Sequence, residues 1–190
     1  MTRRLTFRPS LTLRGRKFKG LRGWAGKPLH PPLTDVPIGA YTITAVFDLL
    51  SLIGGRNRSW AHELYRSGTF VIVFGALVSG ATALSGFWDW LRSTEPGNQA
   101  RRTTNAHAWT MLTMTSLVLV DIALRLHVFD DRRVAPLALV VVSGAVFLIA
   151  FVGATLGGSL VFDYGFNVEN ASSTPVWKPS EVDLLPGDHR

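Results

Sequence analysis

Four long apolar stretches separated by short polar segments dominate the pattern of this chain. They cover about residues 36–53, 67–88, 106–126 and 137–161. A bilayer core about 30 Å thick needs about 20 helical residues at a rise of 1.5 Å each. The last stretch is the clearest, since no charged residue occurs between Arg133 and Asp163. The pattern therefore predicts four transmembrane helices.

The residues between the apolar stretches indicate where these helices begin and end. Gly54 and Gly55 close the first stretch, and Ser59 is a plausible N-cap for a helix that begins near Trp60. Pro136 stands at the start of the fourth, in the first turn that tolerates proline. We expect an all-α bundle of four transmembrane helices, with both termini on the same side. The predicted parts are a basic N-terminal tail (1–28), a membrane domain (29–166) and a polar C-terminal tail (167–190).

Composition supports this class and excludes several kinds of site. Of the 190 residues, 47% are hydrophobic and 17% charged, whereas about a quarter are charged in a typical soluble domain. There is no cysteine, which excludes iron–sulfur clusters held by Cys, thiolate zinc sites and c-type haem attachment. The net charge of +7 comes from basic residues that flank apolar stretches, so we expect contact with the lipid bilayer and no nucleic acid.

The distribution of basic residues predicts the orientation of the chain. Four spans place both tails and the 92–104 loop on one side, which carries fourteen Lys and Arg residues, against six on the other. Cytoplasmic loops are enriched in basic residues. We therefore expect a multi-pass protein of the bacterial inner membrane with cytoplasmic termini.

Small residues in the second and fourth stretches indicate close approach of helices. Membrane helices pack through glycine and alanine, and a GxxxG spacing is a frequent form of such contacts. The residues predicted to serve in helix packing are Gly75, Gly80, Gly153, Gly157 and Gly158.

Up-and-down threading brings polar residues together near one membrane face. The candidate haem or metal residues there are His30, His107, Asp35 and Asp89. Two imidazoles with carboxylates suit a b-type haem, or a metal ion such as zinc or iron. The plainer alternative is that the histidines only hydrogen-bond helix ends. His127 is 20 residues beyond His107, about 30 Å along a helix and on its opposite face, so a two-haem arrangement is not expected.

Three ionisable residues lie within the apolar stretches and in the other half of the membrane. Asp121 shares a helix face with His107, about 21 Å deeper, and Arg125 follows it by one helical turn. Asp48 is at a similar depth on the first stretch. We predict a buried polar clasp of Asp48, Asp121 and Arg125; the alternative is a proton or ion path.

Four motifs at helix ends resemble the DUF2231 family of bacterial membrane proteins. They are KPLHPPLTDVPIGAY followed by FDLL, GFWDWLR, NAHAW, and LGGSLVFDYGFNV, and together they cover about residues 26–168. The usual family opening is similar to GHPLHPxLxxxPIG; here Lys27 stands where its first His is common, and Asp35 at a position that is His in some relatives. The resemblance implies a four-helix integral membrane protein. Some relatives are joined to a Rieske-type iron–sulfur domain, which this chain lacks.

Two functions of different classes follow, with a third as a lesser alternative. The first is a non-catalytic subunit or anchor of a respiratory or redox membrane complex, contacting a protein partner through its tails. The second is a small haem- or metal-binding redox protein that uses His30 and His107. The third is a proton or ion pathway through Asp121. An enzyme is not expected, because no nucleophile has a general-base pattern near it.

Overall fold

The computed structural model describes residues 20–23, 27–93, 96–166 and 168, and it is helical in most of them. The helices are α1 (His30–Gly54), α2 (Ser59–Ser93), α3 (Gln99–Ala123) and α4 (Leu137–Phe162), and a π-helical segment, Leu124–Val128, continues α3. All four are long and apolar enough to cross a membrane. Over the described ranges, the only β-type pairing is an isolated bridge between Arg22 and Pro28. The predicted all-α, four-span fold is confirmed, and the predictions about most of the two tails lie outside the described residues.

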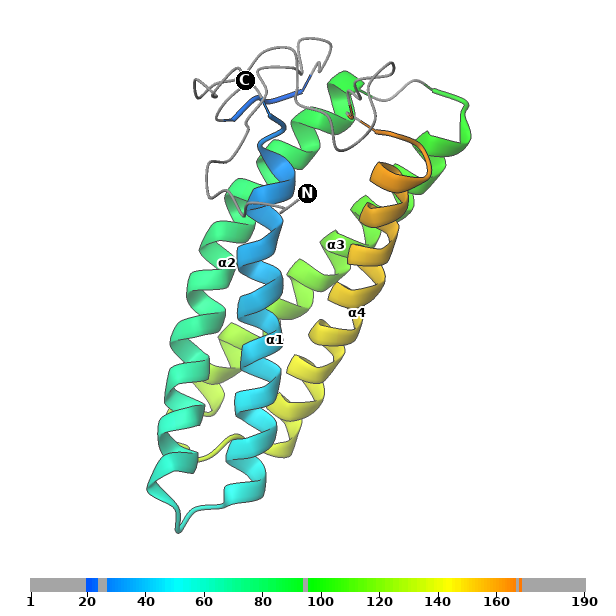
Figure 1. Ribbon diagram of the computed structural model, residues 1–190. Helices are drawn as coiled ribbons and strands as arrows, with labels where there is room; N and C mark the ends of the chain where they lie inside the picture. The colour runs from blue at the N-terminus through cyan, green and yellow to red at the C-terminus, as the bar shows by residue number, and fades with distance from the viewer. Residues whose placement is uncertain (1–19, 24–26, 94–95, 167, 169–190) are drawn as a thin grey trace, which may run out of the picture.

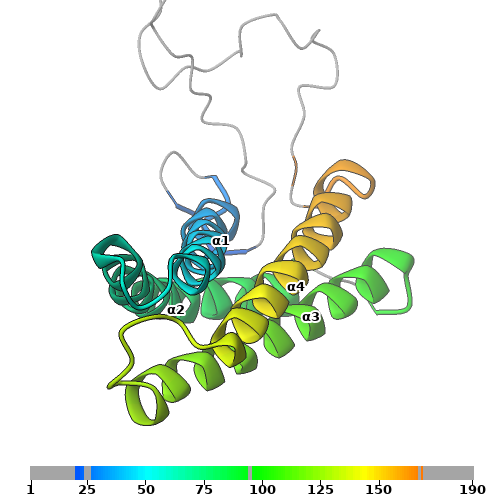
Figure 2. The ribbon, with the colours of Figure 1, turned by 90° about the horizontal axis from the view of Figure 1, so that it is seen from below.

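The helices form two antiparallel hairpins that pack side by side (Figures 1 and 2). α1 packs along α2 and α3 along α4, while α1 also contacts α4 and α2 contacts α3. α1 and α3 are therefore diagonal to each other. Both begin, and α2 and α4 end, at the upper end of Figure 1, which we call the histidine end. The opposite end holds the α1–α2 turn and the π-helical segment.

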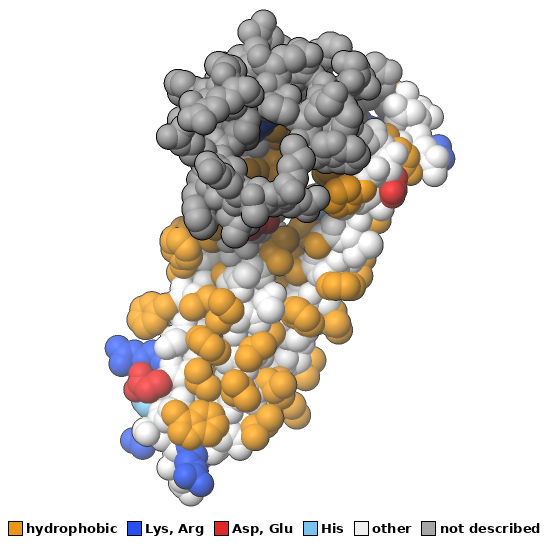
Figure 3. Space-filling view, in the orientation of Figure 1, with side chains coloured by type: hydrophobic (Ala, Val, Ile, Leu, Met, Phe, Trp, Pro, Cys, Tyr) orange, Lys and Arg blue, Asp and Glu red, His pale blue; other side chains and the backbone are white. Residues whose placement is uncertain are grey.

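Hydrophobic side chains face outward along the length of the bundle. Leu77 is 73% exposed and Phe151 is 69% exposed. On the face drawn in Figure 3, hydrophobic side chains cover the middle of the helices, and charged ones lie towards the lower end and at the upper tip. The buried interior instead mixes small, apolar and hydroxyl side chains. This arrangement suits contact with lipid around the middle of the bundle.

α1 and α3 begin earlier than the apolar stretches indicate. α1 starts at His30 because Pro31 and Pro32 occupy its first turn, where the missing N–H groups would have no helical partner. His30 is therefore a helix residue and does not lie in a preceding loop. α3 starts at Gln99 because the Asn98 side chain accepts a hydrogen bond from the Arg101 N–H at 2.8 Å. A proline-rich first turn in α1 and a polar first turn in α3 extend these helices beyond their apolar parts.

Three of the five predicted packing glycines lie where another helix comes close. A Cβ on Gly75 would lie 2.7 Å from the Ala40 Cβ, and one on Gly153 only 2.0 Å from the Met111 Cε. Gly157 faces His107. The other two lie away from the neighbouring helices: a Cβ on Gly80 would meet nothing within 4 Å, and one on Gly158 would meet only Phe162 of its own helix. The spacing of glycines does not reveal which side of α2 or α4 turns towards a neighbour.

Candidate functional site at the histidine end

The His30 ring packs against Thr82, Ser85 and Gly86 of α2, which we call its seat. Its Nδ1 donates a hydrogen bond to the Thr82 carbonyl oxygen at 3.0 Å, and the Ser85 hydroxyl is 3.4 Å from the same nitrogen. The ring lies against Gly86, where an added Cβ would be 2.6 Å from the His30 Cε1. The Thr82 carbonyl therefore fixes the orientation of the ring, and Gly86, one turn later in α2, leaves the space that the ring occupies.

A second contact joins the same part of α2 to α1, and it depends on a proline in α1. Pro37 has no N–H, so the Leu33 carbonyl lacks its usual partner within the helix. The Thr82 hydroxyl lies 3.1 Å from that carbonyl oxygen and 3.0 Å from the Val78 carbonyl oxygen of its own helix, so its one hydrogen is shared between the two acceptors. Thr82 thus joins α1 through its side chain and holds His30 through its backbone.

His107 has an equivalent seat in the other hairpin. Its Nδ1 donates to the Gly153 carbonyl oxygen of α4 at 2.9 Å. A Cβ on Gly157 would lie 3.2 Å from the His107 Cε1, and Gly157 follows Gly153 by one turn, as Gly86 follows Thr82. Each hairpin therefore presents one imidazole in the same way: the carbonyl of the adjacent helix accepts from Nδ1, and a glycine one turn on makes room for the ring.

These contacts fix the tautomer of both imidazoles. A carbonyl oxygen can only accept, so each neutral ring carries its hydrogen on Nδ1 and keeps a lone pair on Nε2. No hydrogen bond joins either Nε2 to a residue in the described ranges. The two rings are near enough to interact electrostatically, although they come from diagonal helices. Two potential ligand nitrogens are therefore presented at one end of the bundle.

Of the two predicted carboxylates, one is part of this group. Asp89 is buried, interacts electrostatically with His30, and accepts a hydrogen bond from the Leu21 N–H at 2.9 Å. Leu21 is in the segment that leads into α1, and its carbonyl accepts from the Leu29 N–H at 3.0 Å. Asp89 therefore anchors the chain that enters α1. Asp35 is exposed and forms no hydrogen bond or ion pair with a described residue, so the structure does not bring it to the histidines.

Aromatic and basic residues line the rim of the histidine end. The Arg101 guanidinium carbon lies 3.9 Å from the centre of the Trp90 ring, and the Trp90 indole donates to the Asn105 side chain at 2.8 Å. These contacts tie the end of α2 to the beginning of α3. Sequence reasoning missed Thr82, Ser85 and Gly86 as the seat of His30. No spacing in the sequence marks this seat, because it depends on which side of α2 turns towards α1.

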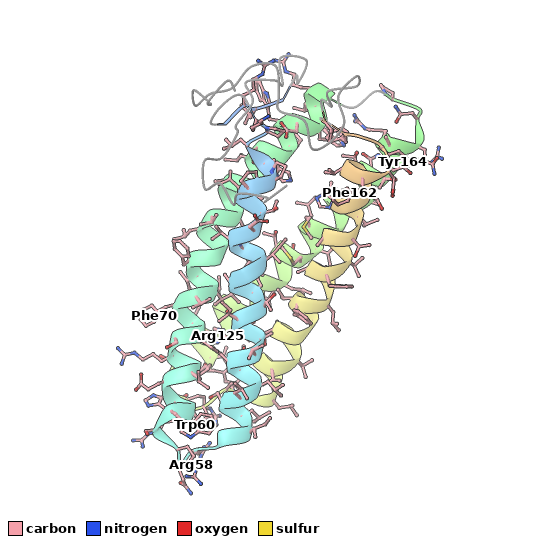
Figure 4. The ribbon with its side chains drawn as sticks, in the orientation of Figure 1. Arg58, Trp60, Phe70, Arg125, Phe162 and Tyr164 are labelled. Carbon is pink, nitrogen blue, oxygen red and sulfur yellow. The ribbon has the colours of Figure 1, made fainter. Side chains whose placement is uncertain are left out.

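The other predicted group, Asp48, Asp121 and Arg125, is deep in the lower half of the bundle. Arg125 belongs to the π-helical segment and points into the bundle, whereas Phe70 points outward (Figure 4). It donates to Asp121 from Nε at 2.6 Å and to Asp48 from Nη2. The two carboxylates come from α3 and α1, so the arginine joins the two diagonal helices.

Comparison with known proteins identifies a family. A family model described as "Predicted membrane protein (DUF2231)" matches residues 26–170, which include all four helices. No curated protein and no solved structure was found to match the chain. The matched region covers most of the sequence, and the four spans agree with the description. This chain therefore belongs to the DUF2231 family of predicted membrane proteins.

Proposed function

We propose that this protein is a small membrane-embedded redox protein in which His30 and His107 hold one b-type haem. One observation carries the proposal. Two imidazoles from diagonal helices each have Nδ1 bound to a backbone carbonyl and an Nε2 that accepts nothing from the described chain. Histidines that ligate iron usually donate their second ring N–H to such a carbonyl, which sets the ring orientation and raises the basicity of the ligand.

The number of protein ligands favours haem over a free metal ion. A structural zinc site has four protein ligands and a catalytic one has three. Among the residues that the structure describes, no group of three or more His, Cys, Asp and Glu could hold a metal ion. Haem iron receives four nitrogens from the macrocycle and needs only two axial ligands. Two histidines without a third partner match that requirement.

The protein's own contribution would be orientation and surroundings. The carbonyls of Thr82 and Gly153 prevent rotation of the rings, and Gly86 and Gly157 leave space beside them. A haem held there would supply reversible one-electron transfer. Asp89 places a carboxylate near His30. Its charge would influence the reduction potential of an iron bound there.

An absorption experiment on the full chain tests the proposal. The protein is expressed with a haem precursor in the medium, purified in mild detergent, and measured oxidised and reduced. We expect about one non-covalent haem per chain, with the spectrum of low-spin iron bound by two imidazoles. His30→Ala and His107→Ala should each abolish the low-spin spectrum, because each removes one axial ligand.

His62→Ala and His127→Ala are the matched controls. Both histidines are exposed at the opposite end of the bundle, so these variants should keep the full haem spectrum. A featureless wild-type spectrum would reject the haem. Stoichiometric zinc or iron in that same sample would instead support the alternative of a metal ion at the two histidines. Haem retained by both His30→Ala and His107→Ala would place it elsewhere.

We also propose a wider role as a non-catalytic subunit or anchor of a redox membrane complex. What supports it is the anchoring of Leu21 on Asp89, because this contact holds the described segment before α1 near the histidine end. A partner that contacts this segment would lie near the proposed haem. Gentle solubilisation and co-purification test this role: a redox protein should be retained by the full chain and lost when residues 1–19 are removed.

A further inference from the structure

The cluster of Asp48, Asp121 and Arg125 has an excess of negative charge. Arg125 is 2% exposed, and the two aspartates are fully buried. Two carboxylates face one guanidinium, so a fully ionised cluster would carry a net charge of −1 inside the bundle. An uncompensated charge in such a place costs several kcal/mol. Something else must therefore balance it.

Each aspartate uses only one of its oxygens. Arg125 donates to Asp121 Oδ1 and Asp48 Oδ2, while Asp48 Oδ1 and Asp121 Oδ2 are buried and have no hydrogen-bond partner. A buried carboxylate oxygen without a donor is unfavourable in addition to the unbalanced charge. Both features belong to the same two carboxylates, and one bound proton would reduce both.

The nearby hydroxyls do not supply that group. The Thr44 hydroxyl donates to the Ala40 carbonyl at 2.9 Å, and the Thr69 hydroxyl donates to the Tyr65 carbonyl at 3.1 Å. The Tyr65 hydroxyl donates to the Phe129 carbonyl, also at 3.1 Å. Their hydrogens are thus directed to backbone oxygens, and none points at Asp48 or Asp121.

Within the described ranges, no other charged side chain is paired with the cluster. Tyr65, on α2, faces Arg125 with its ring centre 5.5 Å from the guanidinium carbon, and Asp130 lies beyond it. α4 contains no titratable residue. α1 contributes only Asp48 at this depth, since its His30, Asp35 and Tyr41 are nearer the histidine end. The cluster therefore depends on a small cation from solution.

We propose that Asp48 and Asp121 together bind one proton, so that the cluster is neutral at physiological pH. A proton on either carboxyl balances the charge and turns an unpaired oxygen into a donor. A sodium ion fits less well, because hard cations gather about six oxygens, and only two are unpaired here. The proton belongs to the pair as a unit. The site is a proton-binding centre inside the membrane, in the half of the bundle away from the histidines.

Infrared spectroscopy on the full chain in lipid tests this proposal. With the aspartate carboxyls labelled with ¹³C, a protonated acid gives a C=O band that is separate from the carboxylate bands and shifts with the label. We expect about one such band per chain at neutral pH, disappearing at alkaline pH. It should be absent in Asp48→Asn and in Asp121→Asn, because either change leaves one carboxylate paired with Arg125.

The controls separate this centre from other carboxyls. Asp35→Asn and Asp131→Asn alter exposed residues and should keep the band, and Asp89→Asn identifies any band from the histidine end. The wild-type measurement stands even if a variant fails to fold. No acid band in the wild type, a band lost only in Asp89→Asn, or a band kept in either cluster variant would overturn the proposal. A protein that is more stable in sodium salt than in choline salt, and that shows no acid band, would also overturn the proposal. The band should persist in His107→Ala, so failure of the haem proposal leaves this result unaffected.

Discussion

Gly86 and Gly80 are two glycines of α2 with opposite surroundings. A Cβ on Gly86 would lie 2.6 Å from the His30 Cε1 and 2.9 Å from its Nδ1, whereas one on Gly80 would meet nothing within 4 Å. Ring atoms held by a carbonyl cannot retreat without breaking that hydrogen bond. The role of each glycine is thus set by its neighbour, and the residue type does not reveal it.

We predict opposite effects for alanine at these two positions. Gly86→Ala should move the His30 ring, remove its hydrogen bond to Thr82 and lower stability by about 1–2 kcal/mol. Gly80→Ala should leave stability unchanged or raise it by up to about 1 kcal/mol. Thermal unfolding in detergent, followed by circular dichroism, measures both. Equal effects of the two substitutions would contradict the seat described for His30.

Some side-chain contacts follow from spacing alone, and others do not. Asp121 and Arg125 are one helical turn apart, so their contact can be predicted without knowing the fold. The seats of His30 and His107 depend on how α2 and α4 are rotated about their axes, which a glycine-rich apolar sequence leaves undetermined. For the same reason the exposed Asp35 could not be separated from the buried Asp89 beforehand.

At the scale of the element, the contact between α1 and α2 depends on a missing hydrogen bond. Pro37 leaves the Leu33 carbonyl free, and the Thr82 hydroxyl takes the place of the absent N–H at 3.1 Å. A proline inside a helix normally costs stability. Here the neighbouring helix satisfies the freed carbonyl, so the proline joins two helices.

A double-mutant cycle tests this link. Thr82→Val should cost about 1 kcal/mol in the native sequence, because it leaves the Leu33 carbonyl unpaired. In a Pro37→Ala background the new N–H can bond that carbonyl, so the same change should cost clearly less. Thr113→Val is the control: its hydroxyl bonds only its own helix, to the Trp109 carbonyl, and its cost should be equal in both backgrounds. An equal free-energy cost of Thr82→Val in both backgrounds would refute the link between Pro37 and Thr82.

The number and order of the helices, and that each is long enough to span a membrane, could be predicted because lipid demands long apolar runs. The first turns of the helices could not be predicted, because polar residues and prolines stand there. The run beginning near Val36 omits His30, which starts α1. The π-helical segment was also unforeseen, since LRLHV carries no proline or glycine to mark it. Its wider turn ends where the Phe129 N–H bonds the Leu124 carbonyl at 2.9 Å.

At the scale of the whole molecule, the orientation in the membrane remains a prediction of basic-residue counting. The chain has no cysteine, so a single introduced thiol gives an unambiguous label. Asn57, in the α1–α2 turn, and Gln99, at the start of α3, are exposed at opposite ends of the bundle. They report the two sides separately.

We predict that Asn57→Cys reacts with a membrane-impermeant maleimide added to intact spheroplasts. Gln99→Cys should react only after the membrane is permeabilised, because the histidine end is expected in the cytoplasm. The unmodified chain serves as the blank. The reverse labelling pattern would invert the orientation, and labelling of both from outside would reject a spanning bundle.

The length of α2 bears on the depth of His30 in the membrane. Its 35 residues extend about 52 Å, and even at a tilt of about 40° they cover about 40 Å of depth. The hydrocarbon layer is only about 30 Å thick, so part of α2 must stand among lipid headgroups. The arginine and tryptophan pair at its end, Arg92 over Trp88 at 4.9 Å, suits that zone. We therefore expect His30, about one turn below this pair, to be nearer to one aqueous surface than to the other, and an electron carrier serving the proposed haem would reach it from a single side.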